Sequence, residues 1–245
     1  HTKIALIVRK EKGRLRNYFH IGTGNYNSNT SKFYTDLGLL STDPDIASDL
    51  IELFNFLSGF SKQKPYQKIL VSPFSLRDKF IFLINREIKH AEQGKKAQII
   101  AKMNSLVDPE IIQLLYSASQ AGVKINLIIR GICCLYPQRK NLSENIEVKS
   151  IIGHFLEHSR IYWFSNNDNH EVFIGSADWM RRNLDRRIEA VTPIEDLQLK
   201  SQIYSLLQTY IQDDYFSWIM KENGSYTKYA LDSANNRSQI DLIKQ

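Results

Sequence analysis

A short pattern of residues occurs twice in the chain, at 1–26 and at 156–179, and it restricts the fold more than any other feature. Each copy has a histidine and, two positions later, a basic residue, followed by an apolar run, a polar turn and a second apolar run. Two apolar runs joined by a turn are typical of a β-hairpin. Because side chains on a strand alternate with period two, the histidine and the basic residue point to the same side. The repeat therefore predicts two related hairpins.

Each copy ends in a turn of small and polar residues, Gly-Thr-Gly-Asn-Tyr at 22–26 and Gly-Ser-Ala-Asp-Trp at 175–179. Such turns expose backbone N–H groups and form a concavity that binds anions. An acid follows the first glycine of each turn by fourteen residues, Asp36 in the first copy and Glu189 in the second. A carboxylate can orient an imidazole through its second ring nitrogen. We interpret the two copies as half-sites that face each other.

The repeated residue types suit phosphoryl transfer. An unperturbed imidazole has a pKa near ~6.5, so at neutral pH a ring nitrogen of His1 or His158 is free to attack phosphorus. Lys3 and Arg160 can hold the phosphoryl oxygens. One histidine would be the nucleophile and the other an acid or base across the same phosphorus. The alternative is that both histidines are ordinary strand residues beside exposed cations, and the repetition of both ends of the pattern counts against it.

The paired pattern resembles that of the phospholipase D superfamily, and the chain is more closely similar to the C-terminal part of the long bacterial polyphosphate kinases. Phosphodiesterases of the superfamily have an aspartate five residues after the lysine, where this chain has Val8 and Ser165. This departure counts against a phosphodiesterase or nuclease, which is kept as an alternative. The segments that carry the resemblance lie between residue 1 and about residue 192, at 1–3, 20–27, 34–36, 127–133, 156–160 and 176–180.

The resemblance implies a reversible transfer of the terminal phosphate of ATP to inorganic polyphosphate through a phosphohistidine. The family's phosphorylated histidine falls on His1, and its residues that contact nucleotide and phosphate fall on Tyr34, Arg130 and His158. The catalytic pair would be His1 and His158. The family uses Mg²⁺, which would be carried by the nucleotide phosphates, because the metal-associated residues of the family lie upstream of His1 and no metal ligand is assigned here.

The partners that the resemblance implies are ATP or ADP and inorganic polyphosphate, with a homo-oligomer in the full-length form and no nucleic acid. We expect the segment to be inactive without the upstream domains of the family. A formal net charge of +6 favours anionic partners in general. A non-catalytic polyanion-binding module therefore remains a third interpretation.

The expected fold class is α/β, with two phospholipase D-like domains whose mixed sheets are flanked by helices. The first domain would span 1–64 and be truncated at its N-terminus, and the second would span 69–245, with the Lys/Gln/Pro-rich stretch 61–68 between them. From residue 69 to Arg130, apolar runs alternate as β-α-β-α-β, which predicts a buried parallel sheet. Ligands of such sheets bind at the carboxyl ends of strands, where Arg130 stands.

The remaining elements are predicted from local signals. Asp43 and Pro44 mark the start of a helix that ends near residue 58. Further predictions are a strand at 35–40, helices at 76–93 and 109–120, a strand at 186–191, a closing helix at 193–214 and a frayed polar tail at 221–245. The arginine-rich stretch 180–187 is either a solvated face or a cationic lining for a polyanion.

The location of the protein is predicted from two absences in the sequence. No apolar run approaches the ~18 residues of a membrane span. The two cysteines, Cys133 and Cys134, are adjacent, so they indicate neither a long-range disulfide nor a zinc site. We expect a cytoplasmic protein and leave peripheral attachment to the inner membrane open.

Overall fold

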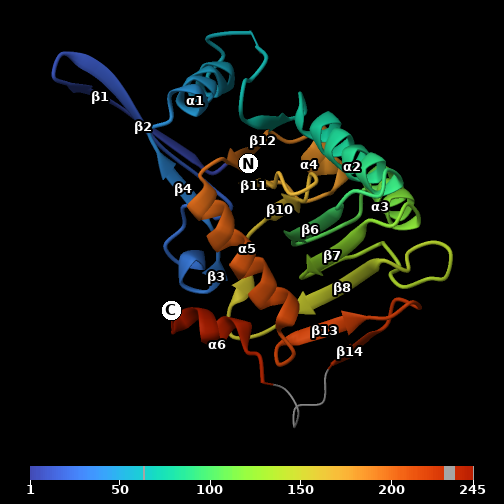
Figure 1. Ribbon diagram of the computed structural model, residues 1–245. Helices are drawn as coiled ribbons and strands as arrows, with labels where there is room; N and C mark the ends of the chain where they lie inside the picture. The colour runs from blue at the N-terminus through green and yellow to red at the C-terminus, as the bar shows by residue number, and fades with distance from the viewer. Residues whose placement is uncertain (63, 229–234, 245) are drawn as a thin grey trace.

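The structure is a computed structural model, and it describes residues 1–62, 64–228 and 235–244. The described strands form three sheets (Figure 1). The strands are β1 (Ile4–Glu11), β2 (Arg14–Gly22), β3 (Tyr34–Thr35), β4 (Gly38–Ser41), β5 (Leu70–Ser72), β6 (Gln98–Met103), β7 (Lys124–Ile129), β8 (Ile146–Ile151), β9 (Leu156–Glu157), β10 (Ile161–Phe164), β11 (Glu171–Gly175), β12 (Glu189–Ile194), β13 (Ser217–Met220) and β14 (Tyr226–Lys228). The helices are the 3₁₀ turn η1 (Thr30–Lys32), α1 (Pro44–Leu57), α2 (Leu76–Glu92), α3 (Pro109–Gln120), α4 (Arg181–Asp185), α5 (Leu197–Gln212) and α6 (Ser238–Ile243).

The largest sheet has nine strands in the order β14-β13-β8-β7-β6-β10-β11-β12-β5. Its centre, β6, β7 and β8, is parallel, and every other pair in it is antiparallel. The expected α/β class with a mixed sheet flanked by helices is confirmed. The order predicted for β5, β6 and β7 is correct in direction, but three strands from later in the chain lie between β5 and β6.

Helices cover both faces of this sheet (Figure 1). On β6, Ile99, Ala101 and Met103 belong to the apolar cluster that contains α2 and α3. Ile100 points to the other face and belongs to the cluster that contains α5. Alternation of side chains along a strand explains why one short segment supplies both layers. None of the described helices is both long enough and apolar enough to cross a bilayer.

Residues 4–57 form the sheet β1-β2-β4 with α1 packed against it. Asp43 caps α1 by accepting from the backbone N–H groups of Asp45 and Ile46, as the sequence predicts. The helix buries Ile46, Leu50 and Leu53 against Phe19 and Ile21 of β2, in a cluster that also contains Ile69, Val71 and Ala190 from the edge of the large sheet. The two parts of the chain thus share apolar packing, and the boundary placed at 64–69 stays a prediction.

Several predicted elements differ from the observed ones. The strand expected at 35–40 is divided into β3, which pairs with β9 in parallel, and β4, which joins β2. The hydroxyl of Thr23 breaks this segment, because it donates to Asp36 at 2.6 Å and accepts from the backbone N–H of Leu37 at 3.0 Å. The strand expected at 186–191 is β12, which runs on to Ile194 and delays α5 until Leu197.

The polar tail is not frayed where it is described, and that expectation was wrong. Residues 217–228 form the hairpin β13–β14 at one edge of the large sheet. In α6, the amide of Gln239 donates to the carbonyl oxygen of Phe155 at 2.9 Å and accepts from the N–H of Phe155 at 3.0 Å. Side-chain hydrogen bonds that no local sequence pattern predicts therefore hold this segment in place. Residues 229–234 and 245 lie outside the described part.

Candidate active site

The predicted site residues lie at one end of the strands of the nine-stranded sheet, where β6 and β7 have their carboxyl ends, and we call this end of the strands the edge. The parallel strands β6 and β7 end at this edge, and β10, which is antiparallel to β6, begins there. Because β11 and β12 are antiparallel in turn, β11 ends and β12 begins at the same edge. The topology therefore gathers the residues that follow or precede these strands, namely Asn104, Arg130, His158, Arg160, Asp178 and Glu189.

His158 is held between residues of both halves of the chain. The pairing of β3 with β9 places the ring of Tyr34 at 5.0 Å from the imidazole, between ring centres. The carboxylate oxygens of Asp36 lie 2.8 and 3.0 Å from Nδ1 of His158. The histidine is buried. The acid that follows the first turn therefore orients the histidine of the second copy.

Arg160 fixes the tautomer of His158. Its guanidinium lies 3.0 Å from Nε2 of His158 and also donates to the carbonyl oxygen of that residue at 2.8 Å. A guanidinium can only donate, so Nε2 carries the lone pair and Nδ1 carries the hydrogen that faces Asp36. Arg160 is itself held by Asp178 at 3.2 Å and by the carbonyl oxygen of Thr23 at 3.3 Å. The result is an imidazole with both ring nitrogens engaged, Nδ1 by Asp36 and Nε2 by Arg160.

His1 and Lys3 form the corresponding group of the first copy. The ammonium of Lys3 contacts Nδ1 of His1 and donates to the carbonyl oxygen of His1 at 2.6 Å. Burial lowers the pKa of Lys3 to about 8, and the negative charges of Glu189 and Asp36 act against this lowering while the positive charge of Arg160 adds to it. Charges from both copies therefore act on one lysine, so the two half-sites form one site.

Glu189 is the acid of the second copy, and it lies beside the first copy, just as Asp36 of the first copy lies beside His158 of the second. The backbone nitrogen of His1 donates to the carbonyl oxygen of Ile188 at 2.5 Å, which places His1 beside the start of β12. Oε1 of Glu189 accepts from the amide of Asn183 at 2.9 Å, and its Oε2 has no hydrogen-bond partner among the described residues although it is buried. Asp36 thus orients His158, and Glu189 acts electrostatically on Lys3 of the first copy.

Arg130 lies at the end of β7, and the two terminal amino groups of its guanidinium, which we call its open fork, are available to a ligand. Its Nε donates to the side-chain oxygen of Asn104 at 2.9 Å and to the carbonyl oxygen of Glu157 at 3.0 Å. Within the described residues its two terminal amino groups have no hydrogen-bond partner. Asn104 also donates to the carbonyl oxygen of His158 at 3.2 Å, so Arg130 and His158 are linked through one amide. An anion could therefore be bound by Arg130 in a bidentate manner.

A buried ion pair lies behind His158, and the sequence did not reveal it. Lys102 of β6 points toward α5, and its ammonium lies 2.9 Å from Oε2 of Glu157. The hydroxyl of Thr35 and the amide of Gln239 each donate to Glu157 at 2.8 Å. Burial raises the pKa of Glu157, but the charge of Lys102 and these hydrogen bonds outweigh it and hold the pKa below its ordinary value. A lysine inside an apolar strand was the only signal in the sequence.

The described site does not fit a metal ion held by the protein. No three His, Cys, Asp or Glu side chains are grouped to bind one in the part of the chain that the structure describes. Asp36 and Asp178 are engaged by His158 and Arg160.

Gly24 leaves room for Asp36, because a Cβ at this position would lie 2.6 Å from the carboxylate. Of the arginine-rich stretch, Arg187 acts electrostatically on Lys3, whereas the side chain of Arg181 is 76% exposed.

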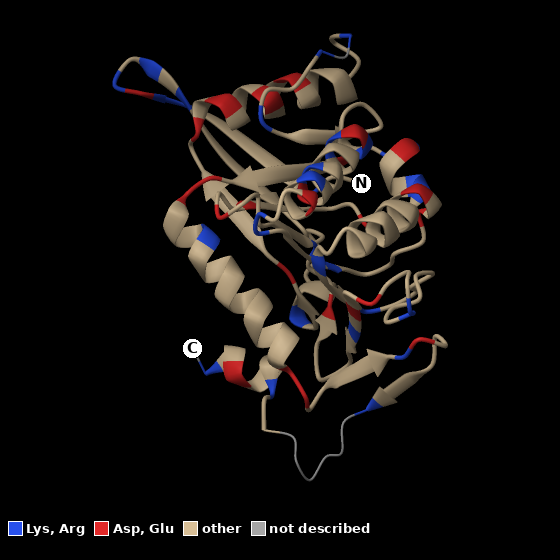
Figure 2. Ribbon diagram, turned by 45° about the vertical axis from the view of Figure 1, so that its right-hand side comes forward, with Lys and Arg blue, Asp and Glu red and all other residues tan. Residues whose placement is uncertain are grey.

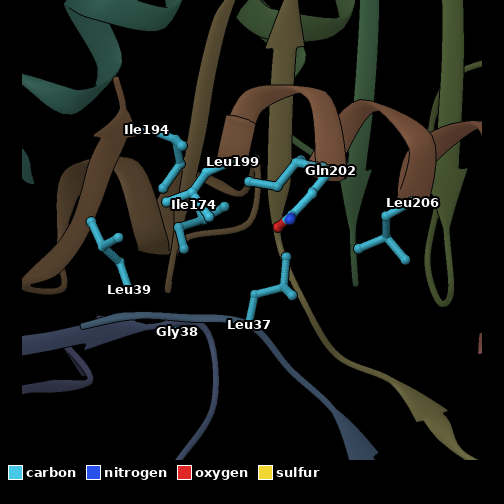
Figure 3. A pocket seen from close by; sticks show the side chains of 9 residues that line it. Leu37, Gly38, Leu39, Ile174, Ile194, Leu199, Gln202 and Leu206 are labelled. Carbon is cyan, nitrogen blue, oxygen red and sulfur yellow. The ribbon is translucent and has the colours of Figure 1, made fainter. Parts of the chain in front are cut away.

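Two pockets adjoin residues 36–38. One, of about 400 Å³, is lined by His20, Tyr26, Tyr34 and Asp36 among others, and therefore opens onto the site. The other, of about 250 Å³, lies between residues 37–39 and α5, and Figure 3 shows their side chains pointing toward one another. It is lined by apolar side chains and Gln202, with no ionisable group, so it does not suit a phosphate.

The chain matches two adjacent family descriptions along almost its whole length. Residues 1–63 match the family described as polyphosphate kinase C-terminal domain 1, and residues 69–239 match polyphosphate kinase C-terminal domain 2. The chain is 58% identical over its full length to the polyphosphate kinase of Parasynechococcus marenigrum (strain WH8102) and 47% identical to that of Pseudomonas aeruginosa (strain PAO1), and it covers 35% and 36% of these proteins.

A solved structure of the same kind matches the fold. The crystal structure of polyphosphate kinase from Porphyromonas gingivalis superposes with a TM-score of 0.92 and 36% sequence identity, over 99% of this chain and 38% of that one. The chain thus spans about a third of the length of the curated relatives it matches.

Proposed function

The chain belongs to the polyphosphate kinase family, and from this premise we propose that it carries the histidine chemistry of an ATP-polyphosphate phosphotransferase. The observation that supports this most is the imidazole of His158, fixed between Asp36 and Arg160 on the side where His1 and Lys3 also lie. The whole enzyme would need the parts of the longer relatives that this chain does not include.

His1 is the nucleophile in this proposal. A bond forms between a ring nitrogen of His1 and the terminal phosphorus of ATP as the bond from that phosphorus to the ADP oxygen breaks, and ADP leaves. In the second step a terminal oxygen of polyphosphate forms a bond to the same phosphorus as the nitrogen–phosphorus bond breaks. The polyphosphate chain is then one phosphate longer, and both steps are reversible.

The other site residues position and stabilise charge. We assign to His158 the protonation or the orientation of the departing and accepting phosphate oxygens, with its Nδ1 held by Asp36. Lys3 and Arg160 stabilise the phosphoryl oxygens, and the open fork of Arg130 and the ring of Tyr34 bind the nucleotide. Positioning and electrostatics supply most of the catalysis in phosphoryl transfer.

The proposal also includes the metal, the substrates and the assembly. The nucleotide phosphates would carry Mg²⁺, which would offset part of their negative charge. The substrates are ATP or ADP and inorganic polyphosphate, and the full-length protein acts as a homo-oligomer in the cytoplasm.

The test is the labelling of the full-length protein with ATP that carries a labelled terminal phosphate. We expect an acid-labile phosphate on His1, absent from His1→Ala and retained on His1 in His158→Ala. In His158→Ala, turnover should fall by about 10²–10⁴, the usual range for a general acid or base. A phosphate mapped to His158, with His1→Ala still labelled, would reverse the assignment. Salt-dependent binding of polyphosphate without any labelling would instead indicate a non-catalytic module.

A further inference from the structure

The hairpin β1–β2 projects from the molecule and carries a concentration of positive charge at its tip (Figures 1 and 2). Between residues 9 and 16 the sequence has five basic residues and one acid. Figure 2 shows the basic segments of the tip together with the acidic one. The fold does not need this charge, because α1 packs only against the base of the hairpin, through residues such as Leu6 and Phe19.

The strand register sorts these charges between the two faces of the hairpin. Arg9 lies opposite Arg16, and Glu11 lies opposite Arg14. Directly opposite residues share a face, so the three arginines and Glu11 lie together. Lys10 lies opposite Leu15 on the other face, which is the face that packs on α1 nearer the base. We call the first face the arginine face; its polar and charged residues are Arg9, Glu11, Arg14, Arg16, Tyr18 and His20, and it also carries Ile7 and Ala5 opposite Tyr18 and His20.

The arginine face has more positive charge than its own contacts neutralise. Glu11 lies 3.4 Å from Arg9 and 3.9 Å from Arg16, and it accepts from the hydroxyl of Tyr18 at 2.9 Å. One carboxylate thus serves the face, while the side chains of Arg9 and Arg16 are 70% and 56% exposed. Like charges directly opposite each other destabilise a sheet. An external anion would relieve this repulsion.

The arginine face is continuous with the candidate active site. At its base, Nδ1 of His20 lies 2.6 Å from the hydroxyl of Tyr26, and both residues line the pocket of about 400 Å³ that also contains Tyr34 and Asp36. Side chains on one face of β2 recur every second residue, so Tyr18 and Arg16 follow His20 outward. At a rise of about 3.3 Å per residue, Arg16 stands about 13 Å beyond His20. An extended anion that leaves the pocket would meet the arginines next.

We propose that the arginine face binds the polyphosphate chain where it extends beyond the active site. This inference rests on the proposed function for the identity of the polyanion, and on the register, the exposure and the adjoining pocket for its location. The guanidinium groups can bind any phosphates along the chain, because their contacts are made to a uniform backbone. Only a chain long enough to extend from the pocket reaches them, so the consequence is a preference for long chains over short ones.

The test compares two double variants of the full-length protein that remove the same charge from the same hairpin. Arg9→Gln/Arg16→Gln changes the arginine face. Lys10→Gln/Lys12→Asn changes the opposite face and the turn, with asparagine chosen because residue 12 has a φ of 45°, which asparagine tolerates. Binding of a long fluorescent polyphosphate and of a short oligophosphate is measured over a range of salt concentrations.

We expect the arginine variant to bind long polyphosphate about tenfold more weakly at low salt, with its salt slope reduced by about 2, one for each lost phosphate contact. Its affinity for the short oligophosphate should change much less. The lysine variant should bind both as the wild type does. Arg14→Gln, whose guanidinium has no hydrogen bond or ion pair among the described residues, is a second variant on the same face and should weaken the binding of long chains alone.

Three results would overturn the proposal. These are equal losses in the two double variants, no loss in either, or a loss for the arginine variant that is as large for the short oligophosphate as for the long chain. Competition by single-stranded RNA as strong as that by polyphosphate would assign the face to nucleic acid instead. Failure of the wild type to form a phosphohistidine would refute the proposed reaction but would leave this binding comparison valid, so the two failures can be told apart.

Discussion

The carboxylate of Asp36 lies 2.8 Å from Nδ1 of His158, although the two residues belong to different copies of the repeat and are 122 positions apart. Each copy therefore depends on the other for the group that orients its imidazole or acts on its cation. The repeat in the sequence predicts the residue types, but it does not indicate which histidine each acid orients. In the fold, Asp36 of the first copy lies beside His158 of the second, because β3 pairs with β9.

Asp36→Asn tests this contact. The substitution keeps the size of the side chain and removes the charged acceptor that faces Nδ1 of His158 and orients its ring, so the turnover number should fall by about 10–100-fold. The KM for ATP should change little, since Arg130 and Tyr34 remain. Steady-state kinetics of the full-length enzyme measure both, with Glu144→Gln, an exposed carboxylate away from the site, as the control. A change in KM alone would show that Asp36 contributes to binding and not to orientation.

Arg130→Lys tests the open fork. Lysine keeps the positive charge but loses the planar pair of donors, and a hydrogen bond to a charged group contributes about 1.5–3 kcal/mol. The KM for ADP and ATP should rise by about tenfold or more while the unfolding midpoint stays close to that of the wild type. Arg181→Lys, at a side chain that is 76% exposed, is the matched control. An unchanged KM would remove Arg130 from the nucleotide site.

Lys3 should give the site a dependence on pH. Burial lowers its pKa to about 8, so half of the Lys3 side chains have lost their proton at this pH in the unliganded protein, and the affinity for phosphate should fall as pH rises through 8. Lys3→Arg stays charged, so its affinity should be less dependent on pH between 7 and 9 (about one unit on either side of 8). Titration of polyphosphate binding against pH in both proteins measures this, and parallel curves would contradict it.

The same pKa has a consequence for stability, and its sign can be stated. The folded pKa of about 8 lies below the ordinary value of 10.5, so between these pH values the unfolded chain binds more protons at Lys3 than the folded chain does. The contribution of Lys3 to the free energy of unfolding should therefore rise with pH across this window. Denaturant unfolding of wild type and Lys3→Met at several pH values measures the difference.

Lys102 and Glu157 should behave as one buried unit. Lys102→Met leaves the carboxylate of Glu157 buried without its partner, which should cost about 3–5 kcal/mol in the free energy of unfolding. Lys102→Met/Glu157→Gln should recover much of this loss, since neither charge remains. The exposed pair Lys96–Asp168, at 2.8 Å, is the control, and Lys96→Met should cost less than about 1 kcal/mol. Equal costs for the two lysines would show that burial is not what couples the pair.

Elements with local signals could be predicted from the sequence, and elements that depend on distant pairing could not. The capped helices α1 and α3 begin at the predicted residues because Asp43 and Asp108 supply their caps within three positions. The insertion of β10, β11 and β12 beside β6 depends on contacts between remote segments, and no local pattern reveals it. β8 alternates apolar and polar residues and carries the signal of a strand, although it was not predicted.

The site shows the same division. His1, His158 and the two acids were identified because the pattern repeats, and Arg130 because it ends an apolar strand. Asn104 and Lys102 are single polar residues in or after a buried strand, and only the structure shows that Asn104 links Arg130 to His158. The role of a lone polar residue depends on its contact partner, and the sequence alone does not identify that partner.

Gln239, in the last described helix, donates to the carboxylate of Glu157, and Thr35 donates to the same carboxylate from near the other end of the chain. During synthesis on the ribosome both histidine motifs emerge well before this group has all its donors. A product terminated shortly before residue 239 would contain every motif of the site and still leave a buried acid without one of its hydrogen bonds. Such a truncated product should therefore unfold more readily than the longer chain and be cleaved faster by proteases.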